Sequence, residues 1–311
     1  MTDSKHTPLL LSAALVVLLV VGPLLPQWQF LAIIAIGKGL TVLGLLLLLR
    51  TGLVSFGQGL FYCLGAYAAG VLGQYWGITD AALMLLAAML VSGVVAAVLG
   101  ILLAAYRSIF FAMLSLALSM ILYGLLVKSA ALGSTDGFNL PLPTLFGYTI
   151  SGHAGRYALY ALACGVAFVA ALSMYYYFRT PLGRLSTAIR DNEIRVEYLG
   201  ASVRQAVHIK YTIAGVLAGV GGALTAMTVG HIDPEMAYWT TSGEFVFVAI
   251  LSGSGSVAAP FLGSFIFELI RTFAYEYSPN TWQLALGLVM LLIIVFLPAG
   301  LWSLFQRRRN A

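Results

Sequence analysis

The stretch RTPLGRLSTAIRDNEIRVEYLGASVRQAVHIK, residues Arg179–Lys210, is the only long polar segment in a chain that is otherwise almost entirely apolar. It holds six of the sixteen Lys and Arg residues. Apolar segments long enough to cross a lipid bilayer flank it on both sides. The stretch therefore predicts a membrane protein with one extended polar loop, and the partner of that loop becomes the main question.

The composition of the chain supports the same class. Hydrophobic residues make up 61% of the sequence and charged residues 9%, whereas soluble domains carry about 25% charged residues. About twenty apolar residues span a bilayer as a helix, and a helix satisfies its own backbone hydrogen bonds where water is absent. We therefore expect an all-α polytopic membrane protein, with residues 1–311 forming one transmembrane domain and residues 179–210 its cytoplasmic loop.

The apolar segments predict about eight to ten transmembrane or half-membrane helices. The first segment lacks the small-residue cleavage pattern of a signal peptide, so we interpret it as a membrane span. The segments cover residues 9–25, 30–49, 58–73, 81–105, 108–130, 157–178, 209–229, 237–252, 257–271 and 283–304.

The distribution of basic residues predicts the orientation. If the N-terminus is cytoplasmic and every segment crosses, then Lys5, Arg50, Arg107, the six basic residues of the polar loop and Arg307–Arg309 all lie in the cytoplasm. Cytoplasmic loops of membrane proteins carry an excess of Lys and Arg. This rule also accounts for the net charge of +5 without nucleic acid as a partner. Both termini are therefore expected on the cytoplasmic side of a prokaryotic inner (plasma) membrane.

Two loops then lie on the opposite side. Residues 131–156 are rich in Gly, Pro and Ser, and residues 230–236 carry Asp233 and Glu235. Both are either solvated connectors or a docking surface for an extracellular partner, and the longer loop exceeds the usual length of a connection.

Glycines repeat at the same spacing in two places. Gly57 and Gly65 match Gly255 and Gly263, and a small residue follows each second glycine. Transporters are often built from repeated halves with broken helices near the substrate path, but small residues also let helices pack closely. An internal repeat and simple close packing both remain open.

The sequence offers no sign of an enzyme. It lacks the phosphate-binding motif GxxxxGK[ST], the zinc motif HExxH and the nucleophile motif GxSxG. The four histidines are scattered, and the two cysteines lie singly in apolar segments. We expect no catalytic residue, metal or cofactor, and any ATP-driven process would need a separate ATPase.

Ionisable residues fall within several of the apolar segments, where charge is expensive and usually functional. Glu268 and Arg271 are three residues apart, which places them on one helix face, and a structural ion pair is the simpler interpretation. Lys38 lies in the middle of its segment. It should face either a wet cavity or an acidic partner.

Within the polar loop, Pro181 and Gly183 predict a turn, and good helix formers follow from Ser186 to Tyr198. Leu185, Ile189, Val196 and Leu199 fall roughly on one apolar face, and Gly200 follows as a helix-ending glycine. The loop therefore predicts a short cytoplasmic helix of mixed charge.

A family resemblance gives this helix a role. The segment GLVSFGQGLFYCLGAY (Gly52–Tyr67) resembles a signature of the branched-chain amino acid permeases of ABC importers. PLGRLSTAIRDNEIRVEYLG (Pro181–Gly200) resembles the cytoplasmic loop of that family, and SGEFVFVAILSGSGSVAAPFLGS (Ser242–Ser264) and FLPAGLW (Phe296–Trp302) match it further. The pattern is most similar to the LivM-type permease subunit.

The resemblance implies an inward transporter of branched-chain amino acids that works by alternating access. Its implied partners are a second homologous permease subunit, two cytoplasmic ATP-binding subunits, an extracytoplasmic substrate-binding protein and membrane lipid. The binding protein would dock near Asp136, Asp233 and Glu235. The residues implied in coupling to the ATPase are Arg184, Arg190, Asn192, Glu193, Glu197 and Gly200. The candidates for lining the translocation path are Lys38, Ser55, Gly57, Gly65, Gly253, Gly255 and Gly263.

Departures from the family pattern leave the substrate open. Ser252-Gly253 stands where the family usually has a Gly-Gly pair, and Ala259-Pro260 stands where it has Gly-Pro. Permeases for urea and short amides resemble the same subunit. A different class of transporter, a secondary carrier that couples ions through Lys38, Glu244 or Glu268, is the main alternative.

Overall fold

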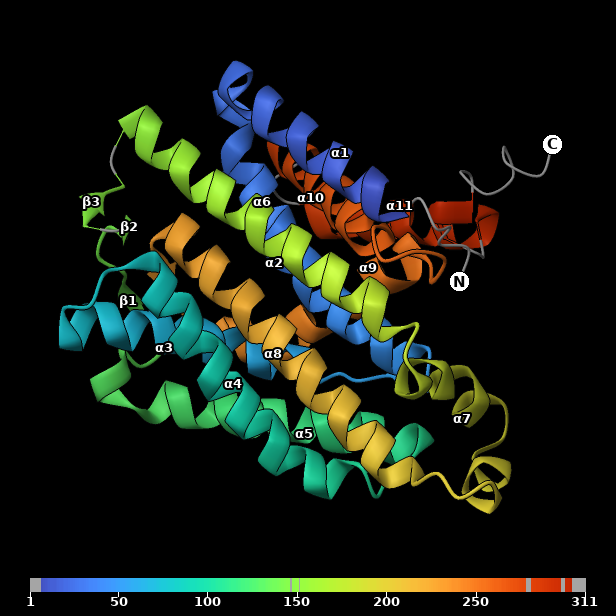
Figure 1. The fold of residues 1–311 in the computed structure, drawn as a ribbon. Coiled ribbons are helices and arrows are strands. Elements are labelled where there is room, and N and C mark those ends of the chain that lie inside the picture. The colour runs from blue at the N-terminus through green and yellow to red at the C-terminus, as the bar shows by residue number, and fades with distance from the viewer. Residues whose placement is uncertain (1–6, 146, 151, 278–280, 298–299, 304–311) are drawn as a thin grey trace.

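The protein is an assembly of packed helices in a computed structural model that describes residues 7–145, 147–150, 152–277, 281–297 and 300–303 (Figure 1). The α-helices in this part are α1 (Thr7–Val21), α2 (Pro26–Leu49), α3 (Gln58–Trp76), α4 (Ala81–Leu103), α5 (Ser108–Lys128), α6 (Gly152–Tyr177), α7 (Pro181–Tyr198), α8 (Val203–Val229), α9 (Trp239–Ser252), α10 (Ala259–Tyr277) and α11 (Trp282–Phe296). The short elements are the 3-10 turns η1 (Gly22–Leu24), η2 (Ala130–Leu132) and η3 (Pro234–Ala237) and the strands β1 (Phe138–Asn139), β2 (Thr144–Leu145), β3 (Tyr148–Thr149) and β4 (His231–Ile232).

All ten predicted apolar segments form helices, and α7 forms from the polar loop. Within the described residues, six helices are long and apolar enough to cross a membrane: α1 with η1, α2, α4, α5, α6 and α8. Helices α9 and α11 have 14 and 15 residues and fall short of the roughly 20 that a full span needs. The predicted class, an all-α multi-pass membrane protein with full and partial spans, is confirmed.

Helix α8 lies at the centre of the molecule and packs against α2, α3 and α4 (Figure 1). Close approach of the backbones depends on glycines: a Cβ atom on Gly65 of α3 would collide with the carbonyl oxygen of Gly219. In the same way, a Cβ atom on Gly221 would collide with the backbone of Gly37 in α2. Small residues permit this packing in membranes, where apolar burial alone drives helix association weakly.

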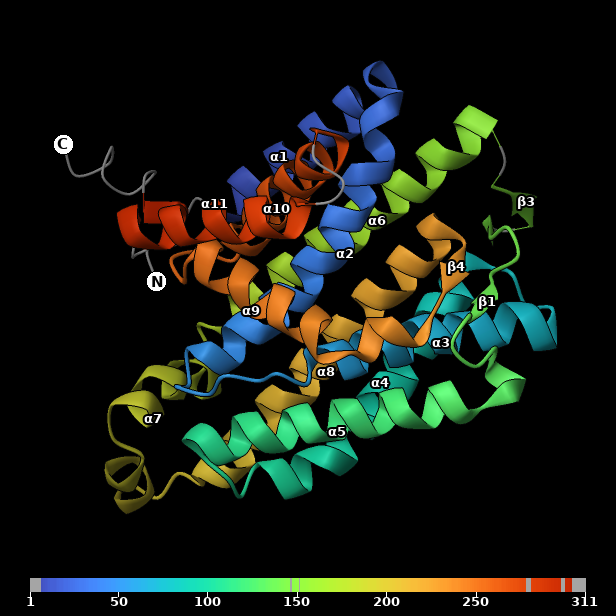
Figure 2. The same cartoon turned by 180° about the vertical axis from the view of Figure 1, so that it is seen from behind.

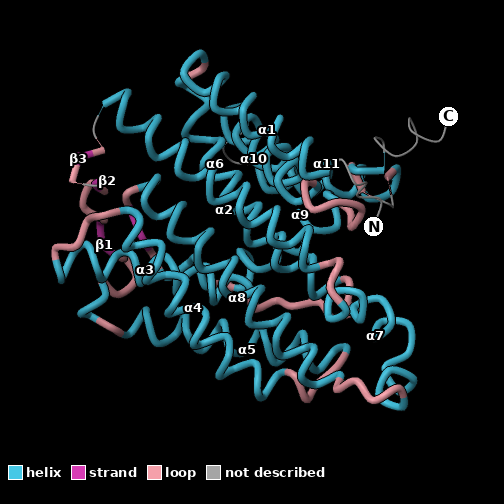
Figure 3. The backbone as a smooth tube through the Cα atoms, viewed as in Figure 1, coloured by secondary structure: helices cyan, strands magenta, loops and turns pink. Residues whose placement is uncertain are grey.

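The two ends of the molecule differ in structure. The short strands gather at one end and α7 lies at the other (Figure 3). β1 pairs with β4 in an antiparallel register that places Asn139 opposite His231, and Figure 2 shows these two strands side by side. The two predicted loops, residues 131–156 and 230–236, therefore form one structured cap rather than two separate connectors.

One basic residue lies elsewhere than its loop predicts. Lys210 belongs to α8 and is fully buried, so it is part of the helix packing and not of a solvated loop. The cause is the start of α8 at Val203, which carries the end of the polar stretch into the helix packing. Two further parts of the orientation argument, Lys5 and Arg307–Arg309, lie outside the described residues.

Candidate coupling site and membrane-embedded charge cluster

Helix α7 begins earlier than the sequence predicts. The hydroxyl of Thr180 accepts a hydrogen bond from the Gly183 backbone N–H at 3.2 Å, which is the geometry of a helix N-cap. Pro181 then occupies the first helical position, where its missing N–H has no consequence. The predicted turn at Pro181–Gly183 is therefore wrong, since these residues form the first turn of the helix.

The helix is interrupted at Asn192. This residue has φ −163° and ψ 100°, which is extended backbone inside an otherwise helical segment. Its side-chain oxygen accepts a hydrogen bond from the Arg195 N–H at 2.9 Å, as an N-cap residue does. Asn192 thus ends one helical piece and caps a second, short one that runs to Tyr198. Gly200 follows with φ +85°, which fits the predicted helix-ending glycine.

The underside of α7 is fixed to the membrane helices. Ile189 and Val196 are buried, and they join a hydrophobic cluster with Leu53, Phe111 and Val203. These three residues come from the α2–α3 loop, α5 and α8. Of the predicted apolar face, Leu199 is the exception: its side chain is 81% exposed. It is the C-cap residue that follows the end of α7 at Tyr198, so helical spacing does not place it on the buried face.

A salt bridge adds a second attachment. Arg107 Nε, in the turn between α4 and α5, lies 2.7 Å from Glu193 Oε2. Arg190 lies against Gly52 in the α2–α3 loop. The two loops and α7, which the sequence assigns to one side of the membrane, therefore meet at one end of the molecule.

The far side of α7 carries an apolar surface that nothing in the described chain covers. Ile194, Tyr198 and Leu199 are 64%, 88% and 81% exposed. We call these three residues the apolar tip. Ile194 and Tyr198 are four residues apart and share one face of the second helical piece. The tip therefore forms an exposed apolar patch within the most polar stretch of the sequence.

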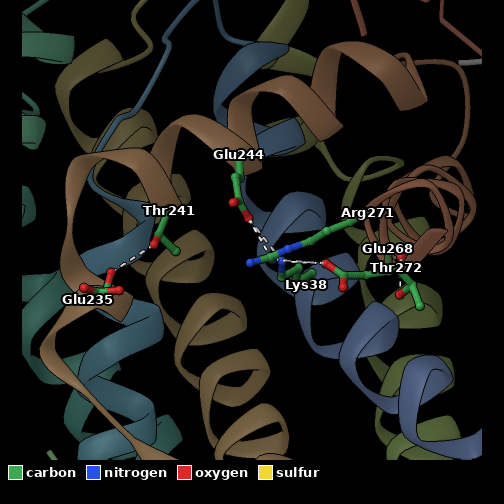
Figure 4. Close-up of polar contacts among 7 residues, drawn as sticks. All are labelled: Lys38, Glu235, Thr241, Glu244, Glu268, Arg271 and Thr272. Atoms are coloured by element: carbon green, nitrogen blue, oxygen red, sulfur yellow. Dashed lines mark hydrogen bonds and ion pairs between the residues drawn. The ribbon is translucent and has the colours of Figure 1, made fainter. Parts of the chain in front are cut away.

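Four charged side chains meet inside the helix bundle (Figure 4). Lys38 Nζ of α2 lies 2.5 Å from Glu268 Oε1 of α10 and 3.2 Å from Glu244 Oε2 of α9. Arg271 Nη1 lies 3.4 Å from Glu244 Oε2 and 3.8 Å from Glu268 Oε1. The predicted ion pair of Glu268 and Arg271 is confirmed, and of the two options for Lys38 the structure favours an acidic partner.

This charge cluster has a buried side and a more exposed side. The side chains of Lys38 and Glu268 are only 8% and 9% exposed, whereas those of Glu244 and Arg271 are 24% and 37% exposed. With two cations and two anions, its formal charge is zero. Removing one member would leave a buried charge without compensation, which is strongly destabilising. The cluster also ties the two short helices α9 and α10 to the long helix α2.

The remaining path candidates lie mostly in tight packing. A Cβ atom on Gly57 would lie 2.8 Å from the Ser115 carbonyl oxygen, and one on Gly263 would lie 2.6 Å from Ser252 Cβ. Ser55 is buried, and its hydroxyl accepts a hydrogen bond from the Gly57 N–H. Gly253, with φ +77°, ends α9, and Gly255 lies in the loop that follows. For Gly57, Gly65 and Gly263, close packing explains the glycine without a substrate.

The sequence matches the family described as branched-chain amino acid transport system, permease component, over residues 9–295. The chain belongs to this permease family. It is 30% identical over 299 residues to the LivM permease protein of the high-affinity branched-chain amino acid transport system of Escherichia coli K12, covering 86% of this chain and 67% of the relative. It is 26% identical to the BraD permease protein of Pseudomonas aeruginosa and 25% identical to LivH of E. coli K12, each over 87% of this chain and 90% of the relative. No solved structure matches the chain.

The matched residues include α2, α7, α9 and α10. The family similarity therefore extends over both the coupling site and the charge cluster. Sequence reasoning named Glu193 and Lys38 but missed Arg107 and the apolar tip. Arg107 was counted only as a basic residue of a loop, because its contact with Glu193 spans 86 residues. The tip residues were missed because they look like ordinary apolar positions until the break at Asn192 is known.

Proposed function

We propose that this chain is the permease subunit of an ABC importer and that α7 receives the mechanical input of a separate ATPase. The observation that carries the proposal is the apolar tip on α7, an exposed anchor on a segment whose other side is packed onto three membrane-helix ends. Exposed aromatic and aliphatic anchors dominate the energy of protein interfaces. A rigid link behind such an anchor transmits partner movement to the helices.

The polar residues of α7 complete the proposed contact. Arg184, Arg190, Asn192 and Glu197 are exposed, as is Gly200 just after the helix. We assign the four polar side chains to the rim of the contact, where they contribute to specificity more than to affinity. Glu193 is half-buried and engaged with Arg107. We therefore assign Glu193 a positioning role, in which it holds α7 against the α4–α5 turn.

The opposite end suits a substrate-delivering protein. Asp136 and Glu235 are exposed on the cap formed by the paired strands, and Asp233 lies between them in sequence order on the same cap. With α7 in the cytoplasm, this cap faces outward, which agrees with the distribution of basic residues. The complete importer in this proposal has a second permease subunit, two ATPases and an extracytoplasmic binding protein. The names of the relatives describe branched-chain amino acid transport systems, and in this proposal the importer moves the same class of substrate inward.

A second function has one observation in its favour. The charge cluster unites Lys38, Glu244 and Glu268, which are the residues that an ion-coupled secondary carrier would use, and intramembrane charges are characteristic of such carriers. The four side chains of the cluster neutralise one another, and the apolar tip offers a surface on which an ATPase could dock. Both observations favour the ABC importer. The same ABC permease architecture could instead carry urea or short amides, which is the alternative to branched-chain amino acids as substrates.

The experiment is copurification of the ATPase subunits with this chain from membranes. We expect Tyr198→Ser combined with Leu199→Ser to reduce the recovered ATPase at least about tenfold, since each buried anchor contributes 1 kcal/mol or more. The matched control is Tyr106→Ser, which removes a tyrosine that is 43% exposed in the α4–α5 turn and should leave recovery unchanged. Equal recovery with the tip variant and with the control would refute the docking role of α7.

A further inference from the structure

A groove lies between the first half of α2 and the second half of α10, beside the charge cluster. Its volume is 580 Å³, within the range of small-molecule sites. Most of its wall is apolar, from side chains that include Trp28, Leu31, Ile34 and Phe273.

The charged residues of the groove are both acidic. Glu268 lies at the inner end, where it contacts Lys38 of the charge cluster, and exposed Glu276 also lines the wall. The two glutamates are eight residues apart on α10, which corresponds to about 12 Å along a helix. No Lys or Arg is among the described residues that line the groove. Glu268 is already paired with Lys38 and Arg271, so Glu276 is the carboxylate of the groove that lies outside the charge cluster and attracts a cationic group, while the apolar walls face the rest of the ligand.

The position of the groove fits entry from the end opposite α7. Helix α2 ends at Leu49 beside the α9–α10 loop, where the Arg50 guanidinium donates a hydrogen bond to the Ser254 carbonyl. The residues that line the groove, 27–34 and 268–276, belong to the opposite ends of the same two helices. The groove thus lies in the half of the molecule that carries the strand cap, with the charge cluster at its inner end.

We propose that this groove binds the transported amino acid as a zwitterion, with its ammonium group on Glu268 and its aliphatic side chain on the apolar wall, while Glu276 attracts the ammonium group from farther along the groove. The proposal rests on the proposed function for the substrate class. Lys38 and Arg271 then become available to the substrate carboxylate. A zwitterion adds one positive and one negative charge, so the cluster can exchange partners with it and stay neutral.

The test is equilibrium binding of radiolabelled leucine to the full chain in lipid nanodiscs, measured with and without the partner subunits and without the binding protein or ATP. We expect Glu276→Gln to weaken binding up to about fivefold, the range of an exposed charge pair. Glu268→Gln should weaken it at least about tenfold, as for a buried charged hydrogen bond. Because Glu268→Gln also removes a partner of Lys38, a second variant, Ile34→Trp, fills the groove from a half-buried position and should abolish binding. Asp191→Asn removes the same charge at the α7 end and should leave binding unchanged.

Two competitors separate ammonium recognition from simple apolar binding. Leucinamide keeps the ammonium group and should displace leucine, whereas 4-methyl-2-oxopentanoate keeps only the carboxylate and should not. Equal displacement by both, or unchanged leucine binding in Glu276→Gln and Ile34→Trp, would overturn the proposal and leave the groove as a lipid-facing surface. The ATPase copurification above is an independent result, so a failed docking of α7 and a failed substrate groove are distinguishable.

Discussion

Reversing the charge of Glu193 tests how α7 is held in place. In the structure Glu193 Oε2 lies 2.7 Å from Arg107 Nε, and the two side chains are 41% and 27% exposed. At that exposure an ion pair contributes up to about 1 kcal/mol. Glu193→Arg removes it and sets two guanidinium groups against each other, which adds on the order of 1 kcal/mol of repulsion at about 4 Å in a high dielectric. The total, about 2 kcal/mol, lowers the braced population of α7 roughly thirtyfold.

The assay is ATP-driven leucine uptake into proteoliposomes that contain the complete transporter. We expect Glu193→Arg to reduce uptake at least about tenfold while the chain still inserts and stays folded, because Ile189 and Val196 keep α7 attached. Uptake is measured at two ionic strengths, because a defect caused by charge repulsion depends on salt. High salt screens the repulsion between the two arginines and should recover part of the activity.

The charge-swapped double variant decides between a brace and a direct ATPase contact. Arg107→Glu with Glu193→Arg restores the pair in reverse, so we expect it to recover most of the uptake that Glu193→Arg loses. If Glu193 instead contacted the ATPase, the double variant would remain as defective as the single one. Unchanged uptake in Glu193→Arg alone would refute the brace altogether.

Three further predictions concern the fold and the charge cluster. Asn192→Ala removes the cap of the second piece of α7, which costs about 1 kcal/mol. Uptake should fall, with little change in the thermal stability of the purified chain. The control Asn192→Asp keeps the cap and should keep most of the uptake. Gly65→Val should abolish recovery of folded protein by size-exclusion chromatography, because its side chain would meet the Gly219 backbone, while Gly124→Ala, with no neighbouring atom within 4 Å, should be neutral. Lys38→Leu leaves Glu244 and Glu268 with Arg271 alone and should destabilise the chain by about 3–5 kcal/mol, seen as a lower melting temperature; an unchanged melting temperature would show that the cluster is not structural.

Much of the fold can be predicted from the sequence, because membrane helices are recognisable from the length and apolarity of their segments. All ten segments were predicted within a few residues at most ends, since a long apolar segment satisfies its own backbone hydrogen bonds in lipid by forming a helix. The departures came where polar residues decide the geometry. Thr180 caps α7 and so turns the predicted Pro181–Gly183 turn into helix, and Asn192 breaks that helix although its neighbours are good helix formers.

The candidate sites were less predictable because they depend on contacts between distant residues. Lys38 was recognisable as an intramembrane charge, but its partner Glu244 lies 206 residues away, and no local pattern indicates that pairing. For the glycine candidates of the path, a local pattern was present but pointed to the wrong cause. Their spacing suggested a repeat near the substrate, whereas for Gly65, the most tightly packed of them, close approach to the Gly219 backbone explains the glycine. An internal repeat stays a prediction.

The energy source of transport is the most direct test of the account. Leucine uptake is measured in proteoliposomes that contain either this chain alone or this chain with its partner permease, ATPases and binding protein. We expect uptake only in the complete assembly, dependent on ATP and insensitive to ionophores that collapse ion gradients. Uptake by this chain alone that disappears when the ion gradient is collapsed would contradict the account and identify the charge cluster as an ion-coupling site instead.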